Sequence, residues 1–325
     1  MALVEIRNLK KYFETPAGLL HAVDDVSLEI EKGTTIGIVG ESGCGKSTLG
    51  KCLIRMVEPT DGTICFDGLD VTAMTEREFR NMRTRMQMIF QDPYASLNPR
   101  MSVSALIAEP IKTFKLARDK KELESMVLEL MDRVGLARRL AGSYPHELDG
   151  GRRQRIGVAR ALSLNPEFIV CDEPVSALDV SIQAQILNLL MDLQEEAGLT
   201  YMFITHDMSV VKHVSDEICV MYLGQIVERC DTRELFANPL HPYAQALLSA
   251  IPRPTIHNKK EPIILEGELT SPINPVARCR FAPRCAHAVD ICFQAEPEMA
   301  EFGSKNHFVK CHRVEELSGV TKIAN

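Results

Sequence analysis

The chain has 325 residues, of which 45% are hydrophobic and 25% are charged, as in an ordinary globular protein. This length exceeds that of a usual single core, so we expect one large domain with a smaller one appended. The net charge of −7 argues against a general nucleic-acid surface, and no run of about 20 apolar residues is present to span a membrane. The start, MALVEIRNLKKYF, lacks the apolar core of a signal peptide, which favours a cytosolic protein.

A glycine-rich segment near the N-terminus follows an apolar strand pattern. Alternating residues predict strands at 3–6, 26–30 and 63–67, and the apolar run 36–39 predicts a buried strand directly before GESGCGKS. This segment matches G-x-x-x-x-G-K-S, in which glycines turn backbone N–H groups toward phosphates. Lys46 is then expected to reach the β- and γ-phosphates, and Ser47 to offer its hydroxyl to Mg²⁺. The predicted nucleotide-binding residues here are Gly40, Glu41, Ser42, Gly43, Cys44, Gly45, Lys46, Ser47 and Thr48.

Helices and strands alternate in the middle of the chain. Apolar positions at helical spacing predict a helix from Lys121 that Gly135 ends, and a second helix over 181–197 that Gly198 ends. Apolar runs at 168–171 and 201–204 predict strands on either side of the second helix. This alternation predicts an α/β fold with a mainly parallel sheet covered on both faces.

Two carboxylates follow the apolar run 168–171. The carboxyl ends of parallel strands lie beside the phosphate loop in this type of sheet, so Asp172 is expected to hold Mg²⁺ through water. Glu173 is expected to act as the base that polarises the attacking water. A solvated strand end is the alternative interpretation of such a pair.

The ten cysteines fall into two groups. Six are scattered through expected core elements, where a reduced thiol packs as a small apolar side chain. Cys279, Cys285, Cys292 and Cys311 follow a proline-rich stretch after Ile251 and are interleaved with arginines and histidines. Their spacing, C-x5-C-x6-C-x18-C, lacks the close pairs of zinc modules and favours a [4Fe–4S] cluster, with zinc or no metal as the alternatives.

Together with further motifs, these features resemble the nucleotide-binding subunit of an ATP-binding-cassette (ABC) transporter over residues 3–255. The resemblance implies that Tyr12 stacks on adenine and that His206 contacts the γ-phosphate. It implies that Gln91 senses the Mg²⁺ that Ser47 and Asp172 are expected to bind. Gln91 is also expected to take part in catalysis, with Glu173 and His206. It assigns a loop that crosses a dimer interface to Ser176, Ala177, Leu178 and Asp179.

The fold implied by this resemblance is an ABC-type P-loop NTPase. It has a RecA-like core, an antiparallel β-subdomain and a helical subdomain, the last over about 92–165. The ATPase domain is expected over residues 1–255, followed by a Pro-rich connector and a Cys-rich C-terminal domain over 256–325. Within the family, relatives that carry an iron–sulfur cluster at the position of the four clustered cysteines support that expectation, in a structural or redox-sensing role.

Three segments resemble the ATPases of dipeptide and oligopeptide importers: QDPYASLNPR (91–100), SYPHEL (143–148) and NPLHPY (238–243). The implied function is ATP hydrolysis that energises a binding-protein-dependent importer. The implied partners are two integral membrane permeases and an extracytoplasmic solute-binding protein, with this chain peripheral on the cytoplasmic face of the inner membrane. Similar subunits import nickel, glutathione or oligosaccharides. A soluble ABC protein acting on ribosomes or DNA, an exporter, and an iron–sulfur regulator with a vestigial ATPase are further alternatives.

One motif departs from the family pattern. The signature Leu-Ser-Gly-Gly-Gln is replaced here by Leu148, Asp149, Gly150, Gly151 and Arg152. Asp149 caps a helix as well as serine does, but a carboxylate about 4 Å from a phosphate oxygen costs on the order of 4 kcal/mol at an effective dielectric of 20. Arg152 is expected to offset part of this cost by pairing with Asp149. We therefore expect a heterodimer with a second, non-identical ABC ATPase subunit and one degenerate site, a harmless exchange of caps being the alternative.

Overall fold

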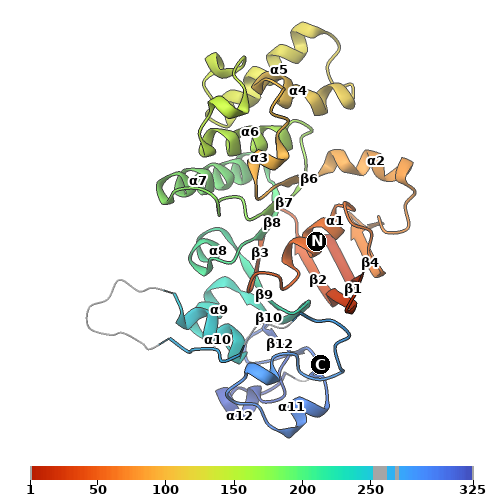
Figure 1. Ribbon diagram of the computed structural model, residues 1–325, viewed down its shortest axis with the longest axis vertical. Coiled ribbons are helices and arrows are strands. Elements are labelled where there is room, and N and C mark those ends of the chain that lie inside the picture. Colours follow the sequence, from red (N-terminus) through yellow and green to blue (C-terminus); the bar gives the residue numbers. More distant parts are fainter. Residues whose placement is uncertain (1, 252–261, 268–270, 324–325) are drawn as a thin grey trace. The chain divides into compact units, whose positions relative to one another are not determined.

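The computed structural model describes residues 2–251, 262–267 and 271–323, which form two compact units (Figure 1). We name the units for their place in the chain. The central unit comprises residues 31–34 and 73–204, and the flanking unit comprises 2–30, 35–72 and 205–323. The boundary expected at residue 255 remains a prediction, and the expected proline-rich connector lies largely outside the described residues.

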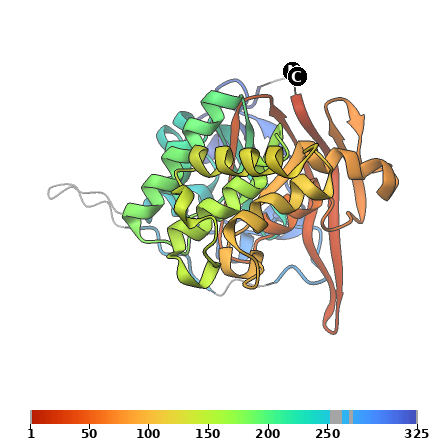
Figure 2. The same ribbon diagram turned by 90° about the horizontal axis from the view of Figure 1, so that it is seen from above.

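The flanking unit contains an antiparallel sheet of four strands in the order β2-β1-β4-β5. The strands are β1 (Ala2–Thr15), β2 (Gly18–Glu31), β4 (Asp61–Phe66) and β5 (Leu69–Asp70). β1 and β2 form the long red hairpin in Figure 2. Buried and exposed residues alternate in the second half of β2, where Val26, Leu28 and Ile30 face the core. This alternation is the signal from which the strands were predicted.

The remaining strands of the flanking unit are in the order β11-β12-β10-β9-β3. They are β3 (Thr35–Val39), β9 (Glu217–Tyr222), β10 (Gln225–Asp231), β11 (Ala300–Glu301) and β12 (Phe308–Val309). β3 and β9 run parallel, and the other neighbours in this series run antiparallel. β3 is buried on both faces, as expected for a strand inside a parallel arrangement.

The flanking unit also contains helices. They are α1 (Lys46–Leu53), α8 (Met208–Val214), α9 (Thr232–Ala237), α10 (Pro242–Ser249), α11 (Asp290–Gln294) and α12 (Val314–Ser318), with a 3-10 turn η3 (Ala282–Arg284). Asp207 and Asp231 cap α8 and α9 by accepting backbone N–H groups of the first turn. α8, α9 and α10 share a hydrophobic cluster with β9 and β10, into which Phe281 of the C-terminal region also packs.

The central unit contains three parallel strands in the order β6-β7-β8. These are β6 (Met86–Ile89), β7 (Phe168–Asp172) and β8 (Thr200–Ile204). All residues of β7 and β8 are buried, in agreement with the apolar runs that predicted these strands.

The helices of the central unit follow the predicted periodicity where the sequence is amphipathic. They are α2 (Glu76–Arg85), α3 (Pro93–Ser96), α4 (Val103–Thr113), α5 (Lys120–Arg133), α6 (Gly150–Leu162) and α7 (Val180–Ala197), with 3-10 turns η1 (Arg138–Leu140) and η2 (Pro145–Glu147). α5 and α7 confirm the two predicted helices, and Gly198 ends α7 in the left-handed conformation. Within the described part of the chain, no helix is both long and apolar enough to cross a bilayer.

Candidate nucleotide site

The phosphate loop joins β3 to α1 in the flanking unit. Gly40 and Gly45 have φ angles of +151° and +108°, which L side chains rarely adopt. A Cβ atom at Gly45 would lie 2.0 Å from the carbonyl oxygen of Ala22, and one at Gly40 would lie 2.1 Å from that of Met221. Glycine is therefore required at both positions for the loop to turn back against its neighbours.

Lys46 is the first residue of α1 and is only 5% exposed. Its ammonium donates hydrogen bonds to the carbonyl oxygens of Gly40 and Glu41, at 2.8 and 2.9 Å. Burial of a charge is costly unless it is hydrogen-bonded, and these carbonyls supply that compensation. The charge is thereby held inside the loop, where a phosphate would meet an ammonium group and a helix N-terminus together. Burial raises the pKa of the neighbouring Cys44 thiol, so this side chain packs as a neutral group.

Tyr12, the expected adenine-stacking residue, lies on β1 of the same unit. Its ring stacks on the imidazole of His21, with the ring centroids 3.8 Å apart and the planes inclined by 25°. Burial and a hydrogen bond to Asp24 raise the pKa of the Tyr12 hydroxyl, which is therefore neutral. The aromatic ring is held in a fixed orientation, as a stacking platform for a base requires.

His206 is the second residue after the end of β8 and belongs to the flanking unit. The preceding N–H of Thr205 donates to the carbonyl oxygen of Ile38 at 3.2 Å, close to the end of β3 that leads into the phosphate loop. Asp207 caps α8 on the other side of the histidine. These two contacts fix the backbone around His206 beside the carboxyl end of β3.

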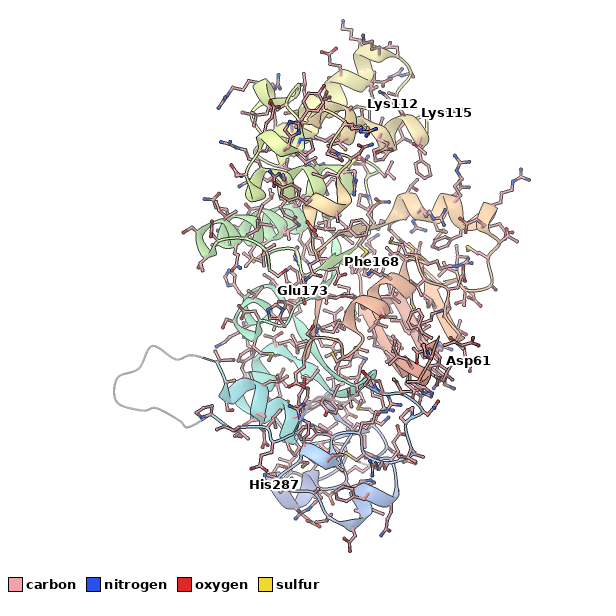
Figure 3. All side chains as sticks on the ribbon, in the orientation of Figure 1. Asp61, Lys112, Lys115, Phe168, Glu173 and His287 are labelled. Carbon is pink, nitrogen blue, oxygen red and sulfur yellow. The ribbon has the colours of Figure 1, made fainter. Side chains whose placement is uncertain are left out.

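The two expected catalytic carboxylates follow β7 in the central unit. Asp172 is buried at the end of the strand, and Figure 3 labels Phe168 at its start and Glu173 just beyond it. Glu173 has a φ of +46°, an uncommon conformation for a residue other than glycine. Its N–H donates to Ile204, and its carboxylate accepts from the amide nitrogen of Gln91 at 3.0 Å. The structure thus brings Gln91 and Glu173 together, as hypothesised for two residues of one catalytic set.

The altered signature opens α6 in the central unit. Asp149 is its N-cap and accepts a hydrogen bond from the Arg152 N–H at 2.8 Å. The Arg152 guanidinium lies 3.3 Å from the same carboxylate, so the predicted cap and the predicted pair are both present. The two side chains are 59% and 49% exposed, which makes this a surface ion pair of small energetic value. Their charges are therefore available to a partner molecule.

The loop expected at a dimer interface lies between β7 and α7 of the same unit. The Ser176 hydroxyl donates to the carbonyl oxygen of Glu173 at 3.1 Å, and Asp179 is the N-cap residue of α7. A Cβ atom at Gly150 would lie 3.1 Å from Leu178 Cδ2. The loop is thus hydrogen-bonded to Glu173 at one end, and its Leu178 lies close to Gly150 of the signature segment.

The donor groups present fit a nucleotide with Mg²⁺. Mg²⁺ prefers oxygen ligands, and the residues expected to hold it offer a hydroxyl (Ser47), an amide oxygen (Gln91) and a carboxylate (Asp172). The glycine loop with its buried lysine matches the requirements of a triphosphate. A strand, this loop and a helix in sequence define a phosphate-loop nucleotide-binding protein.

Comparison with known protein families narrows the class of phosphate-loop protein to which this chain belongs. A family model described as "ABC transporter" matches residues 23–176, and one described as "Oligopeptide/dipeptide transporter, C-terminal region" matches residues 227–292. The chain is 52% identical over 320 residues to the oligopeptide transport ATP-binding protein AppF of Bacillus subtilis, covering 95% of this chain and 97% of that protein. It is 50% identical over 315 residues to OppF of Escherichia coli, covering 96% and 94% of the two chains.

The fold is also similar to solved structures of ATP-binding cassettes. The ATP-binding cassette MJ0796, in a dimeric post-hydrolysis state with ADP and Pi, is 30% identical and superposes with a TM-score of 0.66. The match covers 71% of this chain and 99% of that one. The predicted fold class is thereby confirmed.

The chain therefore belongs to the ATP-binding subunits of ABC transporters, in the oligopeptide and dipeptide importer family. It is an ABC-type ATPase, acting on ATP with Mg²⁺, and a peripheral membrane-associated subunit of an importer. Membership of this family implies membrane permeases and a substrate-binding protein as partners.

The prediction of an iron–sulfur cluster at Cys279, Cys285, Cys292 and Cys311 is wrong. The relatives are plain ABC ATP-binding proteins, and neither matching family model describes an iron–sulfur family. Among the described residues, the potential metal-ligand group within 4.8 Å consists of Glu228, Cys230 and His307, not of these cysteines. Their physical role is packing: Cys292 is buried, and Cys279, Cys285 and Cys311 contact hydrophobic clusters. Burial also raises the pKa of the Cys311 thiol to about 11, which favours its neutral form.

Sequence reasoning missed two residues that contact the phosphate loop. The N–H of Glu41 donates to the Tyr243 hydroxyl at 2.9 Å, and the Glu41 carboxylate pairs with Arg284. Both partners lie about 200 residues or more away along the chain, at separations of 202 and 243. The available signal was a tyrosine in NPLHPY and an arginine among the cysteines, and neither pattern specifies such a contact by itself.

Proposed function

We propose that this chain hydrolyses ATP to drive the uptake of di- or oligopeptides. The observation that carries this proposal is the end-to-end similarity to oligopeptide transport ATP-binding proteins, which includes the C-terminal region. Nickel, glutathione and oligosaccharides are the alternative solutes. We further propose that the chain lies on the cytoplasmic face of the inner membrane, where it transmits ATP-driven closure to the permeases.

The test begins with isolation of the tagged full-length chain from its native membranes in mild detergent. Mass spectrometry is expected to identify two multi-span proteins and a second, non-identical cassette. Uptake of a labelled tripeptide is then compared between a strain lacking the gene and the same strain complemented, with nickel and glutathione as parallel substrates. Loss of nickel or glutathione uptake with normal tripeptide uptake would reassign the solute, and recovery of ribosomal proteins alone would remove the transport proposal.

We propose the following roles for the site residues. Lys46, the loop amides from Gly40 to Thr48 and the Tyr12 ring bind the triphosphate and the base, while His206 contacts the γ-phosphate. Ser47, Gln91 and Asp172 hold Mg²⁺, which neutralises phosphate charge. Glu173 accepts the proton of the attacking water. The hydrogen bond from Gln91 supports this last role, because it orients the carboxylate.

We also propose that the partner ATPase is a different chain and that the site using this signature is degenerate. The support is electrostatic: Asp149 is an exposed carboxylate at a helix N-terminus that, in this family, faces a nucleotide. Arg152 neutralises only part of its charge, since the pair is solvated. A heterodimer allows one altered signature while the other site keeps an ordinary one.

The test replaces Asp149 by Ser and Arg152 by Gln in the assembled complex. Each substitution leaves a residue that can be accommodated at the helix start, so the fold of α6 should persist. Turnover at the second site is expected to rise by at least about tenfold, because removal of one nearby like charge is worth a few kcal/mol. Unchanged kinetics, with a single active site before and after, would contradict the degenerate site.

A further inference from the structure

The C-terminal region, which we define as residues 271–323, carries two arginines that contact the Tyr12 environment and the phosphate loop of the same unit. Arg280 and Arg284 are four residues apart; Phe281 follows Arg280, and Arg284 is the last residue of the turn η3. Phe281 is 2% exposed, and its ring lies 5.2 Å from that of Tyr222 and 5.4 Å from that of Tyr243. This aromatic cluster anchors the segment, so both guanidinium groups start from a fixed backbone.

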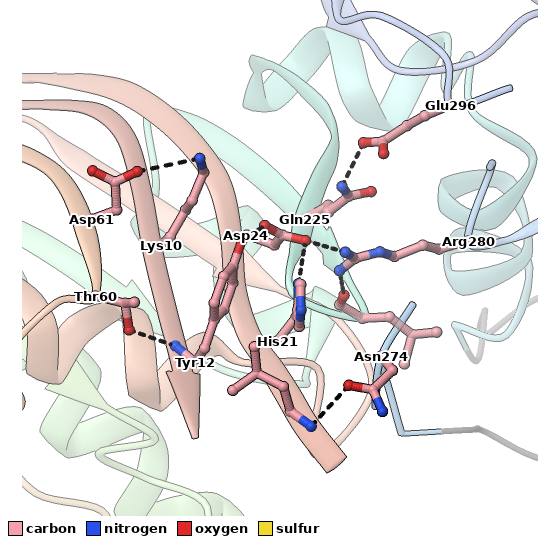
Figure 4. A network of polar contacts seen from close by, with 12 residues as sticks. Lys10, Tyr12, His21, Asp24, Thr60, Asp61, Gln225, Asn274, Arg280 and Glu296 are labelled. Carbon is pink, nitrogen blue, oxygen red and sulfur yellow. Dashed lines mark hydrogen bonds and ion pairs between the residues drawn. The ribbon is translucent and has the colours of Figure 1, made fainter. Parts of the chain in front are cut away.

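Arg280 makes an ion pair with Asp24, and both side chains are nearly buried, at 7% and 13% exposure. The same carboxylate accepts the Tyr12 hydroxyl and lies 2.9 Å from His21 Nδ1 (Figure 4). Burial alone would raise the pKa of Asp24, but the hydrogen bonds from Tyr12, His21 and Arg280 outweigh it and lower the pKa. Asp24 is therefore a charged carboxylate that binds both rings of the Tyr12–His21 stack.

The other guanidinium nitrogen of Arg280 donates to the carbonyl oxygen of Leu223, in the turn between β9 and β10. The next residue, Gly224, donates its N–H to the Cys44 carbonyl at 2.8 Å. The Gly224 carbonyl in turn accepts the Asp24 N–H at 2.8 Å. One arginine thus braces a turn that contacts the phosphate loop at Cys44 and β2 at Asp24, the residue that holds Tyr12.

Arg284 contacts the phosphate loop directly. Its two terminal nitrogens lie 2.7 and 3.1 Å from the two carboxylate oxygens of Glu41, the second residue of the loop. Such a bidentate pair fixes orientation as well as distance. The Glu41 N–H is already bound to Tyr243, so the main chain and the side chain of this loop residue are both held.

The C-terminal region also pairs with the start of β2 through its backbone. Leu20 and Ile273 form an antiparallel bridge, flanked by hydrogen bonds of 2.9 Å from His21 N–H to Pro272 and from Asn274 N–H to Leu19. The Asn274 side chain accepts the Leu19 N–H at 3.0 Å. Residues 272–274 therefore fix the strand that carries His21 and Asp24.

We propose that Arg280 and Arg284 are positioning residues for ATP: Arg280 orients the Tyr12 platform for the base, and Arg284 sets the phosphate loop. The C-terminal region is then a brace that preorganises nucleotide binding in its own chain, rather than a separate module. Preorganised loops bind more tightly because less ordering remains to be done on binding. This inference rests on the nucleotide site proposed above.

The test measures equilibrium binding of ATP and of inorganic tripolyphosphate to the purified full-length chain, by displacement of a fluorescent nucleotide. Arg280→Gln is expected to weaken ATP binding about tenfold and tripolyphosphate binding less than about twofold. The Tyr12 platform loses its direct support through Asp24, whereas the phosphate loop loses only an indirect contact through the Gly224 turn and keeps Arg284. Arg284→Gln is expected to weaken both ligands about tenfold. Arg280→Lys should recover most of the ATP affinity by keeping the charge beside Asp24.

Arg313→Gln is the matched control, because Arg313 lies in the same region but pairs with Glu316 and the carbonyl oxygen of His287. It should bind both ligands like the unaltered chain. Asp24→Asn removes the carboxylate partner of Arg280, and it keeps the inference testable if Arg280→Gln fails to fold. Asp24→Asn should weaken ATP binding selectively, as Arg280→Gln does. The double variant Asp24→Asn/Arg280→Gln should bind ATP little more weakly than either single variant, because both substitutions remove the same ion pair.

Lys46→Ala distinguishes a failure of the proposed nucleotide site from a failure of the proposed brace. If it retains ATP binding, the proposed nucleotide site is wrong. If it loses ATP binding while Arg280→Gln, Asp24→Asn and Arg284→Gln all bind ATP and tripolyphosphate normally, the brace is wrong and the site stands. An equal loss of both ligands in Arg280→Gln, with a lowered melting temperature, would mark a merely structural role and also overturn the inference.

Discussion

Gly45 shows how a single residue fixes the shape of the phosphate loop. Its φ of +108° is unfavourable for any L side chain, and a Cβ atom would lie 2.0 Å from the backbone oxygen of Ala22. Two separate costs would therefore follow from substitution: conformational strain and a clash with backbone that cannot move away cheaply. Gly33 offers the first cost alone, since its φ is +78° and no atom lies within 4 Å of the added Cβ.

We predict that Gly45→Ala lowers ATP affinity by at least about tenfold and destabilises the chain more than Gly33→Ala, which should cost about 1 kcal/mol. Nucleotide titration and urea unfolding of both variants measure the two effects. The difference between them isolates the clash from the φ strain. Equal behaviour of the two variants would show that the loop relaxes around the added methyl group.

At the scale of elements, α6 packs on α7 through a glycine rather than through a large side chain. A Cβ atom at Gly151 would lie 2.6 Å from Ile182 Cγ2, whereas one at Gly157, further along the same helix, would meet nothing within 4 Å. Both glycines weaken the helix intrinsically, because glycine loses more backbone entropy than alanine. Only Gly151 is required by packing.

Gly157→Ala should therefore stabilise the chain by up to about 1 kcal/mol, through helix propensity. Gly151→Ala should instead destabilise it by about 1–3 kcal/mol, because the added methyl overpacks the contact with Ile182. Chemical denaturation of the two variants measures both changes in the free energy of unfolding. A stabilised Gly151→Ala variant would mean that Ile182 can move aside without cost.

The elements also show what could be predicted from the sequence. The helices α5 and α7 and the strands β3, β7 and β8 were predicted because a periodic or fully apolar pattern is local information. The phosphate loop was predictable because its chemistry demands a fixed spacing. The pairing of Arg284 with Glu41 was not, because contacts across 243 residues leave no periodic trace. The cysteine spacing misled for a related reason: side chains that pack individually were interpreted as one ligand set.

At the scale of the whole molecule, one buried histidine links acid stability to the nucleotide loop. His241 is 2% exposed and caps α10, its Nδ1 accepting the Tyr243 N–H at 3.0 Å. Burial lowers the pKa of His241 to about 3. Tyr243, on the first turn of α10, holds the Glu41 N–H of the phosphate loop through its hydroxyl. Protonation of His241 removes its capping lone pair, and so loosens the helix that supports the loop.

The sign of the pH effect follows from proton binding. The unfolded chain takes up a proton on this histidine near pH 6.5, whereas the folded chain does so only near pH 3, so folding is progressively disfavoured between these values. We expect the free energy of unfolding to fall by up to about 1.4 kcal/mol per pH unit below pH 6.5 from this group. His241→Asn keeps a capping side chain without a titrating group, and should flatten that slope in urea unfolding at pH 7, 6 and 5. His213→Asn, at an exposed position on α8, is the control and should leave the slope unchanged. A slope that persists in His241→Asn would assign the acid sensitivity to other groups and separate it from the support of the phosphate loop.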